Sequence, residues 1–126
     1  MVGVVAVANA MLPLPRRSPA GRVVNVSSHL GQLPWVADPS SGAPNLLPYN
    51  ASKSALNAVT VAYARELSGT RIKVNAAEPG FCATDLNGHT GVRSAAQGAA
   101  VIADVARPGA DGPTGALIDE DGPHPW

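Results

Sequence analysis

The 126-residue sequence has no excess of charge, a single cysteine and no long hydrophobic run. Its nine basic and nine acidic residues cancel and are scattered along the chain, so they form no basic patch of the kind that binds nucleic acid. Cys82 cannot form an internal disulfide, which favours a reducing, cytoplasmic compartment. We expect Cys82 to be a packed or loop residue rather than a nucleophile, because no histidine–carboxylate pairing accompanies it in the sequence.

The apolar N-terminal segment, residues 1–12, could be mistaken for a targeting signal, because residues 8–10 resemble a signal-peptidase site. However, no Lys or Arg precedes Arg16, so the positive region of a signal peptide is missing. The run is also too short to span a bilayer and ends at Pro13 and Pro15. The pattern predicts a buried helix, with no membrane partner.

Helices and strands alternate along the rest of the chain, in which 45% of residues are hydrophobic. Residues 22–28 are predicted to form a strand, because Val23, Val24 and Val26 give the near-continuous β-branched run of a parallel strand covered on both faces. Residues 31–48 form a predicted loop rich in Pro, Ser and Gly. At about eighteen residues it is longer than most structural connections, which favours a role at a site.

Further alternation follows this loop, with Gly69 as a stop after the first helix. The expected elements are a helix over 49–67, a strand over 71–77, a weaker helix over 94–106 and a short strand over 115–118. Strand, helix and strand joined by short connections indicate right-handed crossovers and a parallel sheet. The sequence therefore predicts an α/β architecture of the Rossmann type.

Tyr49 and Lys53 lie four residues apart, on one face of the predicted helix. A neighbouring ammonium favours the phenolate and lowers the pKa of the tyrosine towards the range of general acid–base catalysis. The spacing alone is weak, because it arises by chance in ordinary helices. Sites in open parallel sheets form beyond the carboxyl ends of the strands. Ser28 stands at one such end and Pro79 and Gly80 at another, so these groups are expected to converge with Tyr49.

Three blocks carry a resemblance to a known family: Arg-Val-Val-Asn-Val-Ser-Ser at 22–28, Tyr-Asn-Ala-Ser-Lys at 49–53, and Arg-Ile-Lys-Val-Asn-Ala-Ala-Glu-Pro-Gly at 71–80. In this order they resemble the short-chain dehydrogenase/reductase family, over almost the whole chain. The resemblance implies a partial Rossmann-type, doubly wound parallel sheet, in which residues 1–126 form the C-terminal part of a single domain. It also implies an oxidoreductase that transfers hydride between NAD(P) and a small carbonyl or alcohol substrate.

The resemblance further implies catalytic roles for three residues. Ser28 donates a hydrogen bond to the substrate oxygen, Tyr49 gives or takes the proton there, and Lys53 lowers the pKa of the tyrosine and binds the nicotinamide ribose. The residues alone leave plainer alternatives open, in which Ser28 caps the strand end and Lys53 is a solvated helix residue.

The segment after the second strand resembles the loop that holds the nicotinamide carboxamide, with Pro79, Gly80, Cys82 and Thr84 as implied cofactor contacts. The residues alone also allow Thr84, followed by Asp85, to be a helix N-cap. Family analogy favours NADP slightly over NAD. No metal ligand is predicted.

Twenty residues separate Ser28 from Tyr49, more than in compact members of the family. Residues 35–44 look like an insertion that would line the substrate cleft, as in carbonyl-reductase-like relatives. Trp35 would supply an apolar wall there, and a plain packing role fits it equally well.

Three features of the family pattern are missing from this sequence, among them the turn that binds the cofactor's phosphates. The glycine-rich turn, the residue that selects NAD or NADP, and the Asn-Asn-Ala-Gly segment are absent. Gly109, Gly112 and Gly115 precede a predicted strand rather than a helix, so they cannot direct helix N–H groups at a pyrophosphate. Three explanations stay open: a fragment of a full reductase, which we favour, a degenerate product, or a piece completed by a partner.

Two function classes follow from this incompleteness. One is a reductase, homo-oligomeric at full length; the other is a non-catalytic interaction module built on the helices over 1–12 and 49–67. In this chain by itself, a half sheet of three strands would leave the strand that contains Val23 to Val26 as an exposed apolar edge.

Overall fold

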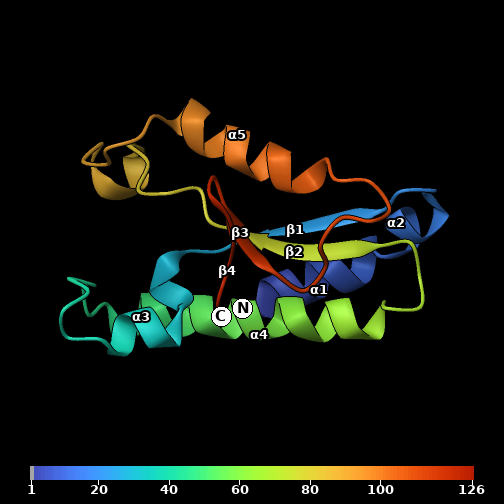
Figure 1. Ribbon diagram of the computed structural model, residues 1–126, viewed down its shortest axis with the longest axis horizontal. Coiled ribbons are helices and arrows are strands. Elements are labelled where there is room, and N and C mark those ends of the chain that lie inside the picture. Colours follow the sequence, from blue (N-terminus) through green and yellow to red (C-terminus); the bar gives the residue numbers. More distant parts are fainter. Residues whose placement is uncertain (1) are drawn as a thin grey trace.

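The computed structural model describes residues 2–126. Figure 1 shows a small sheet with helices on both faces. In chain order the elements are α1 (Val2–Met11), α2 (Pro13–Arg17), β1 (Arg22–Val26), η1 (His29–Gly31), α3 (Leu33–Ala37), α4 (Leu47–Glu66), β2 (Lys73–Ala77), η2 (Asp85–Asn87), α5 (Ala95–Ala106), β3 (Leu117–Asp119) and β4 (Gly122–His124).

The four strands follow the order β1-β2-β3-β4. β1, β2 and β3 are parallel, with Val24 opposite Asn75 and Ala76 opposite Leu117, whereas β4 runs antiparallel to β3. α5 covers one face of the sheet, and α1 and α4 lie on the other (Figure 1). Parallel strands with helices on both faces are the arrangement that the α/β prediction requires, which confirms it.

The centre of the core lies between α4 and β2. Ala64, Leu67, Ile72 and Val74 form a buried cluster, with Leu67 and Val74 almost fully excluded from solvent. Leu67 follows the last residue of α4 and Val74 belongs to β2, so this cluster fixes the helix against the strand that carries the 71–80 motif.

The opposite edge of the sheet is open. β1 pairs only with β2, and Val26 at its end is 43% exposed. α1 has no buried residue, and an apolar groove separates it from β1, with Val7, Met11 and Val23 among its lining side chains. The predicted apolar edge is therefore confirmed. The predicted burial of the 1–12 helix is wrong, because nothing in the described chain covers its outer side.

Three predictions about local structure need correction. Pro13 and Pro15, which were expected to end the apolar run, lie in the first turn of a further helix, α2, where their missing N–H groups cost nothing. The predicted 31–48 loop contains the end of η1 and the short helix α3, again with proline in its first turn. The main helix begins at Leu47 rather than Tyr49 because Pro48 is compatible with its first turn.

The sheet also has a fourth strand that the sequence analysis did not predict. β4 is three residues long and contains Pro123, both of which argue against a strand in a sequence. It lies at the edge of the sheet, where proline is tolerated, and it makes the sheet mixed rather than purely parallel. Within residues 2–126, no helix has both the length and the hydropathy needed to cross a bilayer.

Candidate active site

Ser28 lies two residues beyond the end of β1, in extended backbone, and caps the short helix η1. Its hydroxyl oxygen accepts a hydrogen bond from the amide of Leu30 at 3.2 Å, and the residue is buried. This cap is on the short helix η1, two residues beyond the strand end that the plainer alternative named. It leaves the hydroxyl hydrogen of Ser28 without an assigned acceptor among the described residues, so capping and donation to a substrate oxygen are compatible.

Tyr49 and Lys53 meet on the first turns of α4. The ammonium of Lys53 lies 5.5 Å from the centre of the Tyr49 ring and donates to the carbonyl of Val26 at 2.9 Å. Burial lowers the pKa of Lys53 below its ordinary value. Lys53 is thus not simply solvated, because it ties the tyrosine-bearing helix to the end of β1. Tyr49 itself is 36% exposed.

The four residues predicted for the cofactor lie on the segment that leaves β2. Gly80 has a positive φ of 81°, and a Cβ there would collide with the side chain of Arg93. The thiol of Cys82 lies 3.4 Å from the carbonyl of Pro79, which agrees with a packed loop cysteine. Thr84 is the N-cap of η2, as its alternative predicted, and its amide donates to Asn87.

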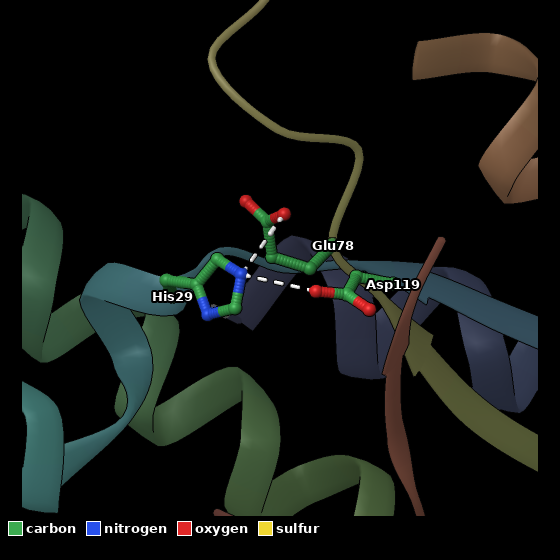
Figure 2. A group of neighbouring side chains, drawn as sticks. All are labelled: His29, Glu78 and Asp119. Atoms are coloured by element: carbon green, nitrogen blue, oxygen red, sulfur yellow. Dashed lines mark ion pairs between the residues drawn. The ribbon is translucent and has the colours of Figure 1, made fainter. Parts of the chain in front are cut away.

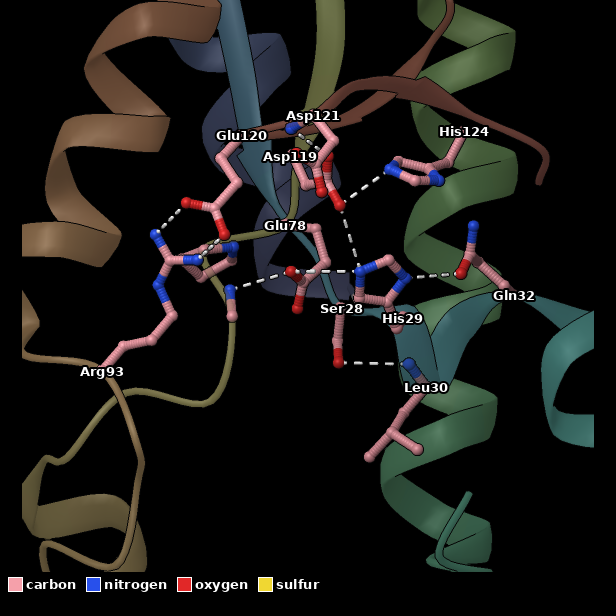
Figure 3. Close-up of polar contacts among 12 residues, drawn as sticks. Ser28, His29, Leu30, Gln32, Glu78, Arg93, Asp119, Glu120, Asp121 and His124 are labelled. Atoms are coloured by element: carbon pink, nitrogen blue, oxygen red, sulfur yellow. Dashed lines mark hydrogen bonds and ion pairs between the residues drawn. The ribbon is translucent and has the colours of Figure 1, made fainter. Parts of the chain in front are cut away.

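A second polar group at the same edge of the sheet was missed by the sequence analysis. The side chains of His29, Glu78 and Asp119 converge where β1, β2 and β3 end, and His124 lies beside them (Figure 3). Burial raises the pKa of Asp119, but the imidazole of His124, the amide of Asp121 and the charge of His29 lower it by more, so that this pKa lies below its ordinary value. The available signal was that His29 and Glu78 come just after predicted strands.

Comparison with known proteins identifies the family of the chain. The sequence model of the short chain dehydrogenase family matches residues 1–95. The "Short-chain dehydrogenase anuI" of Penicillium roqueforti is 37% identical, covering 94% of this chain and 50% of its own length. Among solved structures, salutaridine reductase from Papaver somniferum superposes with a TM-score of 0.81 at 26% identity, covering 95% of this chain and 52% of the other. The RhlG/NADP complex of Pseudomonas aeruginosa gives 0.75 at 26% identity, covering 97% and 53%.

The chain therefore belongs to the short chain dehydrogenase family. Its fold is the α/β fold of that family, in part, since the chain spans half the length of its Penicillium relative.

Proposed function

We propose that this chain carries the proton-transfer half of an NAD(P)-dependent short-chain reductase that acts on a small carbonyl or alcohol substrate. The observation that carries the proposal is the placement of Lys53, whose ammonium contacts both the Tyr49 ring and the Val26 carbonyl. A cation held in this position favours the phenolate form of the tyrosine. Tyr49 is also open enough for a substrate oxygen to reach it.

The three residues then have distinct tasks. Ser28 donates its hydroxyl hydrogen to the substrate oxygen, and Tyr49 delivers a proton to that oxygen during reduction or removes it during oxidation. Lys53 supports the phenolate and binds the nicotinamide ribose. When bound, the nicotinamide supplies or accepts the hydride, and the protein orients it.

The residues present fit one end of this cofactor. The positive φ of Gly80 lets the backbone turn sharply after β2, beside the Cys82 and Thr84 segment proposed to hold the carboxamide. The pyrophosphate end has no counterpart in the described residues, because Gly109, Gly112 and Gly115 precede β3 rather than a helix. We favour NADP over NAD slightly, with the RhlG/NADP neighbour as support.

The test joins the N-terminal half of the Penicillium relative to this chain. In that chimera, Tyr49→Phe is expected to lower the rate of carbonyl reduction by roughly 10²–10⁴-fold, because the proton donor is lost. Tyr63→Phe is the matched control, since Tyr63 lies on the same helix and bonds to Asn9 instead. Near-normal turnover of the Tyr49→Phe chimera would overturn the assignment.

The unfused chain provides a second test. Titration with NADPH, followed by fluorescence, is expected to show no saturable binding below millimolar concentration. Micromolar binding, worth about 8 kcal/mol, would mean that another segment holds the phosphates.

The alternative, an interaction module, has one observation in its favour. The small residues Ala51, Ala58 and Ala62 are exposed along α4, which suits close packing against a second copy. We therefore propose a homo-oligomer that uses this face, in the cytoplasm, where the lone thiol of Cys82 stays reduced.

A further inference from the structure

Three side chains able to bind a metal ion converge at the carboxyl edge of the sheet. His29 opens the short helix that follows β1, Glu78 comes directly after β2, and Asp119 is the last residue of β3. Because these strands are parallel and adjacent, their ends meet at one place (Figure 2). The group thus draws one ligand from each strand end.

The spacing of the three ligand atoms is that of a small coordination site. Nε2 of His29 lies 3.5 Å from Oε2 of Glu78 and 3.3 Å from Oδ2 of Asp119. All three ligand atoms lie within 4.8 Å of one another. In a tetrahedral zinc site with bonds of about 2.1 Å, neighbouring ligand atoms lie about 3.4 Å apart. An ion therefore fits between His29 and each carboxylate with small shifts.

The ring of His29 is oriented as a metal-binding imidazole. The side-chain amide of Gln32 donates to the carbonyl of Pro125 at 2.7 Å, which leaves its oxygen facing His29. Nδ1 of His29 then donates to that oxygen at 2.6 Å. In the neutral ring, Nε2 carries the lone pair and points at the two carboxylates (Figure 3). An outer hydrogen bond on the other ring nitrogen is the usual support of a ligating histidine.

The two carboxylates are held in place and largely shielded from water. The side chains of Glu78 and Asp119 are 8% and 11% exposed. The amide of Gly80 donates to Glu78 and the amide of Asp121 to Asp119, both at 2.8 Å. Two shielded negative charges this close together repel each other, and a divalent cation between them would remove that cost.

His124 has a different position. Its Nε2 is buried and lies 2.7 Å from Oδ2 of Asp119, without the alignment of an ordinary hydrogen bond. This separation is shorter than the roughly 3.4 Å between neighbouring ligands of one tetrahedral ion. His124 is therefore assigned as an outer partner that orients Asp119, which leaves the fourth coordination position for water.

We propose that His29, Glu78 and Asp119 bind one divalent transition-metal ion, Zn²⁺ by this donor set and spacing. The ion would join the ends of three strands and fix the segment that begins at Ser28. The proposal does not depend on the reductase activity, since none of its ligands is assigned to proton transfer.

The first experiment measures zinc binding to the chimera after treatment with a chelator. Calorimetric titration at pH 7.5 is expected to give one ion per chain and a higher melting temperature. His29→Gln and Asp119→Asn are expected to weaken binding by more than about 100-fold. Gln32→Leu removes only the outer support and is expected to cost about 10- to 100-fold.

The matched control is His89→Gln, which is expected to leave zinc affinity unchanged. His89 pairs with Asp85 at 2.8 Å, but both side chains are largely exposed. Replacement of zinc by Co²⁺ identifies the ligands, because a site built on nitrogen and oxygen shows tetrahedral d–d bands without the thiolate charge-transfer band that Cys82 would give. The proposal is overturned if the chimera does not bind zinc stoichiometrically, or if His29→Gln and His89→Gln have equal effects.

Discussion

At the scale of single residues, Lys53 matters most for the proposed chemistry, because its side chain connects helix α4 to the end of strand β1. Its ammonium is half-buried yet bonded to the Val26 carbonyl and placed over the Tyr49 ring. The spacing of Tyr49 and Lys53 predicts that they share a helix face. It does not predict the hydrogen bond from Lys53 to the Val26 carbonyl, because nothing in the sequence of α4 shows that its first turns pass the end of β1.

The lowered pKa of Lys53 gives a pH-dependent prediction. Burial disfavours its charged form, so the folded chain binds the proton less tightly than the unfolded chain, whose lysine pKa is about 10.4. The resulting cost to stability is complete at low and neutral pH and is relieved as pH rises through the folded pKa towards 10.4. Relative to Lys53→Met, the wild type should therefore gain stability between pH 7 and about 10.

Urea unfolding of the two chimeras at matched pH values measures this difference. Lys73→Met is the control, because it removes a different lysine, the first residue of β2. A stability difference between wild type and Lys53→Met that stays constant with pH would contradict the prediction.

At the scale of elements, the strands differ in how well their sequences predict them. β1 was expected because it is rich in valine and ends before Ser27 and Ser28, and β2 was expected because its run ends before Pro79 and Gly80. β3 pairs with β2 through only two residue pairs, and β4 has three residues including Pro123. The cluster of His29, Glu78 and Asp119 depends on this sheet order, which is why sequence reasoning could not assemble it.

Asn75 compensates for the short pairing between β2 and β3. Its side chain is buried, donates to the carbonyl of Pro113 at 2.9 Å and accepts from the amide of Ala116 at 3.1 Å. Asn75→Ala would leave two backbone groups unpaired, and the expected loss of stability is about 1–3 kcal/mol. Denaturant unfolding of the chimera checks this value. Asn45→Ala, in an exposed loop, serves as the control and should change stability little.

At the scale of the whole molecule, the two edges of the sheet differ in how much apolar surface they leave exposed. One edge is the short strand β4, paired antiparallel to β3, and the core between α4 and β2 is well buried. The other edge is β1, beside an α1 helix with exposed apolar side chains, Val2 and Val7 among them at 83% and 63% exposed. The chain spans about half the length of the Penicillium and Papaver relatives, and β1 has a free edge at which further strands could pair.

The open side determines how the chain should behave alone. A strand patterned for two neighbours but paired on one edge is a template for association, and the exposed α1 adds apolar surface next to it. Expressed without the N-terminal half of a relative, the chain is expected to be insoluble, oligomeric or molten, and to bind a hydrophobic dye strongly. Sedimentation and thermal unfolding measure this directly.

The chimera is the control, because its added strands would pair with β1 and cover α1, and its dye binding should fall. If the isolated chain instead sediments as a monomer and melts sharply, the exposed edge of β1 is stable without a neighbour and these residues form a self-contained fold.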